Sequence, residues 1–169
     1  MGVTIHFEGK LKENIPVNEV IKISQQFAEN NFVESSEFEE EKFLFKRVKN
    51  EKDWDYYSSA KGIKMQPSEN TDPLIFEFDD NQYIQDYCKT QYADIEVHIK
   101  IIELLRKIEP YFEELVVFDE GEYWETNDKD LLQTNIDDCF NAIENIKKED
   151  PKQEGPFKMK DGRIVDLMS

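Results

Sequence analysis

The sequence predicts an α+β domain in which an antiparallel or mixed sheet carries about three helices on one face. Several segments alternate apolar and polar residues, others repeat with helical spacing, and strands follow one another in runs between the helices. The expected order is β-α-β-β-β-β-α-β-α. The chain has 169 residues, of which 38% are hydrophobic, which suffices for one core. We expect a single domain over residues 1–148, followed by a tail or small hairpin over residues 149–169.

Elements of the first third follow from short patterns. Residues 3–11 alternate and predict a strand, with His6 on its polar face. The spacing of apolar residues predicts a helix that opens at Pro16 and ends near residues 30–31. Five glutamates within residues 34–41 indicate a solvated loop or a helix turn. Residues 43–48 are predicted to form a strand.

Three further strands and a helix are expected in the middle of the chain. Residues 62–65 indicate a short strand. Residues 74–78 alternate and the apolar pattern resumes at residues 83–84, so a hairpin is predicted around the turn at residues 79–81. Residues 93–108 form the strongest predicted helix, whose broad apolar face implies heavy burial.

The last third is predicted to be a strand followed by a helix. Residues 115–118 indicate a strand, and residues 122–125 either a return strand or an ordered loop. Asn127 or Asp128 is expected to cap the last helix, whose apolar residues extend to Ile146.

Charge is the strongest compositional signal. Lys and Arg total 21 and Asp and Glu total 38, which gives a formal net charge of −17. This surplus argues against binding to nucleic acid or to an anionic membrane surface. It favours either solubility alone or attraction to a basic partner.

The cysteines, the start of the chain and the missing motifs indicate the compartment and the cofactor requirement. Its two cysteines, Cys88 and Cys139, are far apart and do not indicate a disulfide framework. No leader-like start and no apolar run of membrane length is seen, so the cytoplasm is expected. The sequence has no dinucleotide, phosphate-loop, nucleophile-elbow or zinc-protease motif, and we expect no cofactor and assign no metal site. It carries no indication of oligomeric state.

Two histidines are the candidate catalytic groups. His98 falls at the centre of the apolar face of its helix, between Ile95, Ile102 and Leu105. One interpretation is a neutral core histidine bonded to a backbone carbonyl or a tyrosine hydroxyl; the other is a general base or ligand in a cleft. His6 meets His98 only if the first strand turns its polar face to the helices.

An acidic cluster occupies residues 113–130 and has two adjacent aromatic residues in its middle. Tyr123 and Trp124 lie among eight acids and one base, Lys129. The candidate binding and catalytic acids in it are Asp119, Glu120, Glu122 and Glu125. The spacing does not match a calcium loop. The cluster is typical of an interface for a basic protein, or else Trp124 packs into the core while the acids are solvated.

A third group of candidates lies where a strand passes into the strongest helix. Lys89, Thr90 and Gln91 are placed to line a polar pocket near the positive end of that helix. A nucleophilic pair of Cys88 and His98 would require the fold to bring the two side chains within hydrogen-bond distance, and nothing in their spacing predicts this.

Three segments together resemble a group of uncharacterised bacterial proteins of similar length. They read TIHFEGKL in residues 4–11, KTQYA in residues 89–93 followed by His98, and DEGEYWET in residues 119–126. The resemblance spans most of the chain up to the last helix and implies no activity. It does imply that the seven residues His6, Lys89, Gln91, His98, Glu120, Trp124 and Glu125 form one constellation.

Three hypotheses for function follow. The first is an acidic binding module that captures a basic protein partner, as toxin-neutralising immunity proteins do, an analogy of role only. The second is a small hydrolase that uses His98 with His6 and either Glu120 or Glu125. The third is an accessory domain whose acidity maintains solubility.

Overall fold

The computed structural model describes residues 2–46 and 54–169, with side chains given outside residues 45–55. The fold is α+β, as predicted, and contains three small antiparallel sheets. In chain order the elements are β1 (Thr4–Leu11), α1 (Val17–Asn31), β2 (Glu34–Lys46), β3 (Trp54–Gln66), β4 (Leu74–Phe78), β5 (Tyr83–Lys89), α2 (Ile95–Ile108), a 3₁₀ turn (Glu109–Tyr111), β6 (Phe112–Asp119), α3 (Tyr123–Thr126), α4 (Lys129–Glu149), β7 (Phe157–Lys158) and β8 (Ile164–Val165).

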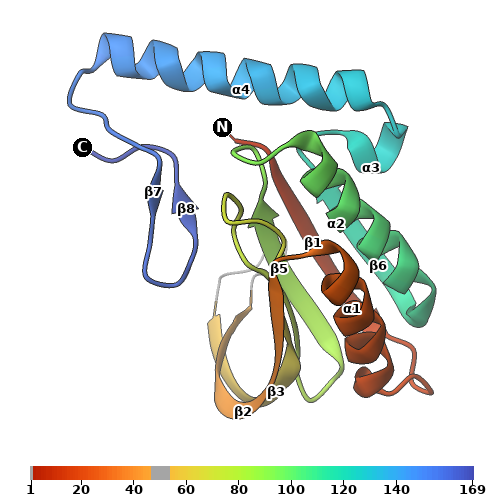
Figure 1. The fold of residues 1–169 in the computed structure, drawn as a ribbon. Helices are drawn as coiled ribbons and strands as arrows, with labels where there is room; N and C mark the ends of the chain where they lie inside the picture. The colour runs from red at the N-terminus through yellow and green to blue at the C-terminus, as the bar shows by residue number, and fades with distance from the viewer. Residues whose placement is uncertain (1, 47–53) are drawn as a thin grey trace.

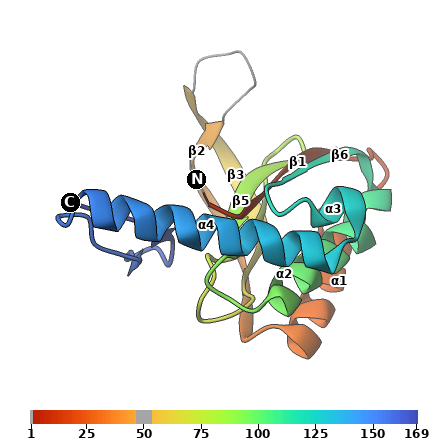
Figure 2. The ribbon, with the colours of Figure 1, turned by 90° about the horizontal axis from the view of Figure 1, so that it is seen from above.

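Two three-stranded sheets form the body of the molecule. Their strand orders are β5-β1-β6 and β2-β3-β4, and a turn at Asp79–Gln82 links β4 to β5. Helices α1 and α2 lie on the same side of these strands, as the view from above shows (Figure 2). Helix α4 runs across one end of the body (Figure 1), and Asp128, one of the two residues expected to cap it, caps its first turn.

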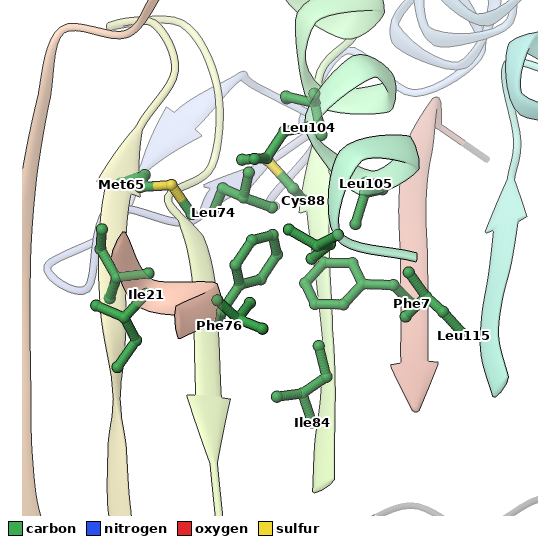
Figure 3. Packing of buried hydrophobic residues seen from close by; sticks show 14 of the residues in the cluster. Phe7, Ile21, Met65, Leu74, Phe76, Ile84, Cys88, Leu104, Leu105 and Leu115 are labelled. Atoms are coloured by element: carbon green, nitrogen blue, oxygen red, sulfur yellow. The ribbon is translucent and has the colours of Figure 1, made fainter. Parts of the chain in front are cut away.

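The main core lies between the two helices and the sheets. Phe7, Phe76 and Leu105 are among its fully buried side chains, and the Phe7 and Phe76 rings meet edge to face at 5.5 Å (Figure 3). A second, smaller cluster joins Val3 and Ile99 to the inner face of α4. This smaller cluster holds α4 against the first strand and α2.

Two local predictions are wrong. The glutamate-rich residues 34–41, expected to be a loop or a helix turn, are part of β2, which pairs with β3 along its whole length. Strand β2 is at an edge and most of its glutamates are exposed, so the charged run is compatible with a strand. Residues 123–126 form the short helix α3 instead of a return strand or loop. The part of the expected strand after residue 46 lies outside the described residues.

The C-terminal segment contains a small hairpin. Strands β7 and β8 pair Phe157 with Val165 and Lys158 with Ile164. The hairpin lies beside the body of the molecule (Figure 1), and polar contacts of Arg163 and Asp166 attach it there.

Candidate functional site

A sealed trio of polar side chains joins α2 to the ends of β5 and β6. His98 Nδ1 lies 2.6 Å from Thr90 Oγ1, and His98 Nε2 lies 3.0 Å from the Asp119 carboxylate. The side chains of His98 and Asp119 have no exposed surface. His98 is thus in the apolar face of its helix, but its partners are a carboxylate and a threonine hydroxyl, not the carbonyl or tyrosine hydroxyl expected of a core histidine.

The Asp119 carboxylate organises the turn that follows β6. Its Oδ1 accepts the backbone N–H of Gly121 at 2.8 Å, and its Oδ2 accepts those of Tyr123 and Trp124, both at 2.9 Å. Burial by itself raises the pKa of Asp119, but the bond and charge of His98 and these backbone donors outweigh it. The net result is a pKa below the ordinary value, so this buried acid is ionised at neutral pH.

Two hydrogen-bond arrangements of the trio are compatible with the geometry. Thr90 Oγ1 also lies 3.3 Å from the carbonyl oxygen of Val3. If Thr90 donates to His98, the ring is neutral and its Nε2–H donates to Asp119. If Thr90 donates to Val3, both ring nitrogens donate and an imidazolium pairs with Asp119. In either arrangement the trio ties three elements together within the protein interior.

His6 lies on the other face of the β5-β1-β6 sheet. It is exposed, while its neighbours Ile5 and Phe7 point into the core beneath the helices. His6 Nε2 lies 3.0 Å from Glu120 Oε1. The structure therefore does not bring His6 and His98 together, because alternate residues of a strand point to opposite faces.

Lys89 and Gln91 make contacts within the chain. Lys89 Nζ donates to Asp166 Oδ1 at 2.9 Å and to the carbonyl oxygen of Ile164 at 3.0 Å. Gln91 accepts the backbone N–H of Val3 at 2.6 Å and donates to Asp166 at 2.8 Å. These two candidate binding residues thus fasten the N-terminal and C-terminal segments to the end of β5.

The adjacent Tyr123 and Trp124 rings of the acidic cluster turn inward. Tyr123 and Trp124 are partly buried and pack against the main core. The Arg106 guanidinium covers the Trp124 ring at 4.8 Å and donates to the Trp124 carbonyl oxygen at 2.7 Å. Glu122 and Glu125 are exposed beside them.

Exposed aromatic side chains gather instead on the outer face of the β5-β1-β6 sheet. Tyr87, His6 and Phe118 are Cα partners across the three strands, and the His6 ring lies 6.0 Å from Tyr87 and 5.8 Å from Phe118. Phe118 is 63% exposed and Val116 is 47% exposed. We call Tyr87, His6, Phe118 and Val116 the aromatic row.

One end of the aromatic row holds an arginine from the C-terminal hairpin. The Arg163 guanidinium lies 4.3 Å from the Tyr87 ring centroid and donates to the Tyr87 carbonyl oxygen at 2.5 Å. It also pairs with Asp86 at 2.7 Å and approaches Asp72 at 3.7 Å. We call Asp72, Asp86 and Tyr87 the arginine clasp.

The sequence contained only part of the signal for this face. The run Leu115–Phe118 is apolar throughout, so its pattern does not show that Val116 and Phe118 point outward. The alternation of Tyr83, Gln85 and Tyr87 could have indicated an aromatic outer face on β5. Nothing in the local pattern indicated that Arg163 reaches Tyr87 across 76 residues.

Thiol chemistry has little support in the geometry. Cys88 is buried, its Sγ donates to the carbonyl oxygen of Asp72 at 3.3 Å, and burial raises the pKa of the thiol well above its usual value. Among the side chains of residues 2–44 and 56–169, no three from His, Cys, Asp and Glu are grouped to hold a metal ion. A reactive thiolate or a clustered cation site therefore does not compete with the aromatic row as a candidate.

Comparisons of the chain with protein-family models, with curated proteins and with solved structures find no match. None of the described helices combines the length and the apolar composition needed to cross a bilayer. Function is accordingly inferred from the geometry of the chain itself.

Proposed function

We propose that this chain is an acidic protein-binding module that captures a basic protein partner on the aromatic row, in the manner of toxin-neutralising immunity proteins. The observation that supports it is the position of Arg163, whose guanidinium stacks on Tyr87 and pairs with Asp86. An arginine stacked on a ring and paired with a carboxylate is a common form of recognition of basic segments. The aromatic row offers the same chemistry next to exposed apolar surface.

Charge supports the same choice of partner. The outward face of these strands carries the carboxylates of Glu8, Glu114 and Glu120, together with Lys10. The net charge of −17 adds a long-range attraction for a basic partner, which speeds the encounter. Exposed Phe118 supplies the apolar contact that a bound partner would bury.

We do not carry the hydrolase hypothesis forward. It needs a substrate to reach His98, and that side chain has no exposed surface. It also needs His6 beside His98, whereas His6 lies on the opposite face of the sheet with Glu120.

The test is binding of a fluorescein-labelled peptide of alternating arginine and leucine, measured by anisotropy at low and high salt. Phe118→Ser should weaken binding about ten-fold, because it removes a central apolar contact. Phe43→Ser is the matched control, because Phe43 is 72% exposed but lies on β2 of the other sheet. Equal loss in both variants, or none in either, would contradict the proposed face.

A further inference from the structure

We propose that the C-terminal hairpin is an intramolecular competitor: Arg163 fills the arginine clasp, and a basic partner must displace it to reach the whole aromatic row. This inference rests on the proposed function, because it concerns access to the same face. After Arg163 has been displaced, an arginine side chain of the partner occupies the clasp in its place.

The clasp is shaped for a guanidinium. Asp72 is 1% exposed, and its Oδ1 accepts the backbone N–H of Ile164 at 2.7 Å while its Oδ2 accepts that of Lys89 at 2.9 Å. Asp86 supplies the second carboxylate and Tyr87 supplies both a ring and a carbonyl oxygen. The Arg163 guanidinium donates to Asp86 and to the Tyr87 carbonyl oxygen while it stacks on the Tyr87 ring. A lysine ammonium has no planar face for this stacking.

The hairpin is held mainly by polar contacts. Its two strands have two residues each, and Phe157, Met159 and Met168 are 38–44% exposed. Its apolar contacts are few: Ile164 is buried, and Leu167 is partly buried against the smaller core cluster. Opening the segment breaks the bonds that Asp166 accepts from Lys89 and Gln91, but it exposes little apolar surface. A partner can replace polar contacts of the same kind.

Tyr87 couples the clasp to the proposed binding face. Its ring contacts Arg163 on one side and lies 6.0 Å from His6 in the aromatic row. A partner arginine can therefore stack on Tyr87 only after Arg163 has left. The apparent affinity of the face for a partner is then the intrinsic affinity multiplied by the fraction of time that the hairpin is open.

The experiment uses the full chain and the arginine–leucine peptide described above. Arg163→Ala should raise the affinity about ten-fold, as expected if the closed hairpin occupies the clasp about nine-tenths of the time. Lys158→Ala is the matched control: it removes the same charge from the same hairpin, but the Lys158 ammonium donates to the Glu69 carbonyl oxygen, outside the clasp. It should change the affinity less than two-fold, by about the general charge effect.

A second variant opens the hairpin without altering any charge. At Gly155, φ is +158° and an added Cβ would lie 2.0 Å from the Asp166 carbonyl oxygen. Gly155→Ala should therefore loosen the segment and raise the peptide affinity as Arg163→Ala does. Amide hydrogen exchange in residues 157–168 should be faster in both of these variants than in free wild type. It should also be faster in wild type saturated with peptide. Adding Asp86→Asn to Arg163→Ala should abolish the gain.

The outcomes separate the two proposals. If the peptide binds wild type in a Phe118-dependent manner but Arg163→Ala and Lys158→Ala behave alike, the competitor inference is overturned and the proposed function stands. If the peptide binds neither wild type nor the opened variants, the proposed function itself fails.

Discussion

The imidazole of His98 lies 3.0 Å from the carboxylate of Asp119, and neither side chain reaches solvent. Because the same carboxylate also receives backbone donors from the turn after β6, this contact fixes the position of α3 relative to α2. The arrangement gives the buried trio a structural role whose removal is measurable.

Replacing Asp119 by Asn should lower the free energy of unfolding by about 1–3 kcal/mol, the cost of leaving buried hydrogen-bonding groups without their partner. The new amide NH₂ would face a backbone N–H whichever way it turns, since both oxygens accept one. Urea denaturation followed by circular dichroism measures the change. Asp138→Asn, at an exposed position of α4, is the control and should shift stability by less than about 0.5 kcal/mol. A loss below about 1 kcal/mol in Asp119→Asn would contradict the role given to this carboxylate.

The trio also makes a specific prediction for Thr90. Thr90→Val keeps the shape but removes the hydroxyl 2.6 Å from His98 Nδ1. A buried ring nitrogen without a partner costs about 1–3 kcal/mol, so the urea midpoint should fall accordingly. An unchanged midpoint would mean that the hydroxyl contributes nothing to the fold.

Stability should depend on pH through Asp119. Its pKa is lowered in the folded protein, so its contribution is present above the unfolded value, about 3.9, and is lost as pH falls through the folded value. The gap in unfolding free energy between wild type and Asp119→Asn should therefore be widest near neutral pH and shrink below about pH 4. Urea titrations of both proteins over this range measure the gap, and a gap that grows on acidification would contradict the assigned shift.

Both thiols should be unreactive in the folded protein. Cys88 and Cys139 are buried, and burial raises the pKa of each thiol. Iodoacetamide at neutral pH should label neither in native conditions and both in urea, as read by mass spectrometry. Rapid native labelling of Cys88 would show that the core near the arginine clasp opens.

Gly121 is expected to tolerate no side chain. An added Cβ would lie 2.6 Å from Leu132 Cδ1 and 3.1 Å from both Asp119 Oδ1 and His98 Cε1. Gly121→Ala should cost about 1–3 kcal/mol by overpacking, measured by thermal or urea unfolding. Wild-type stability in this variant would indicate that α4 is free to move away from the trio.

Helices were the part of the fold that the sequence predicted best. The apolar spacing of residues 93–108 and the Asp128 cap correspond closely to α2 and to the start of α4. Helical spacing is a local property, so it can be read without knowledge of the partner surface. The glutamate-rich start of β2 was missed because its register is set by pairing with β3, while its glutamates by themselves indicate only solvent exposure.

The candidate site was harder to predict because its contacts join distant segments. The burial of His98 followed from its place on the helix, but Asp119 as its partner depends on how β6 crosses α2. Trp124 was expected as an exposed anchor or as a core residue, and it is partly buried beneath Arg106. Phe118 and Tyr87 are exposed because their strands leave one face open, a property of the assembled sheet.

Amide NMR shift mapping of the full chain, titrated with the arginine–leucine peptide, tests the central claim most directly. The account predicts that the perturbed amides cluster on β5, β1 and β6 around Tyr87, His6 and Phe118, and that the signals of the C-terminal hairpin change with them. Perturbations spread evenly over the acidic surface, or centred on β2, would contradict capture by the aromatic row.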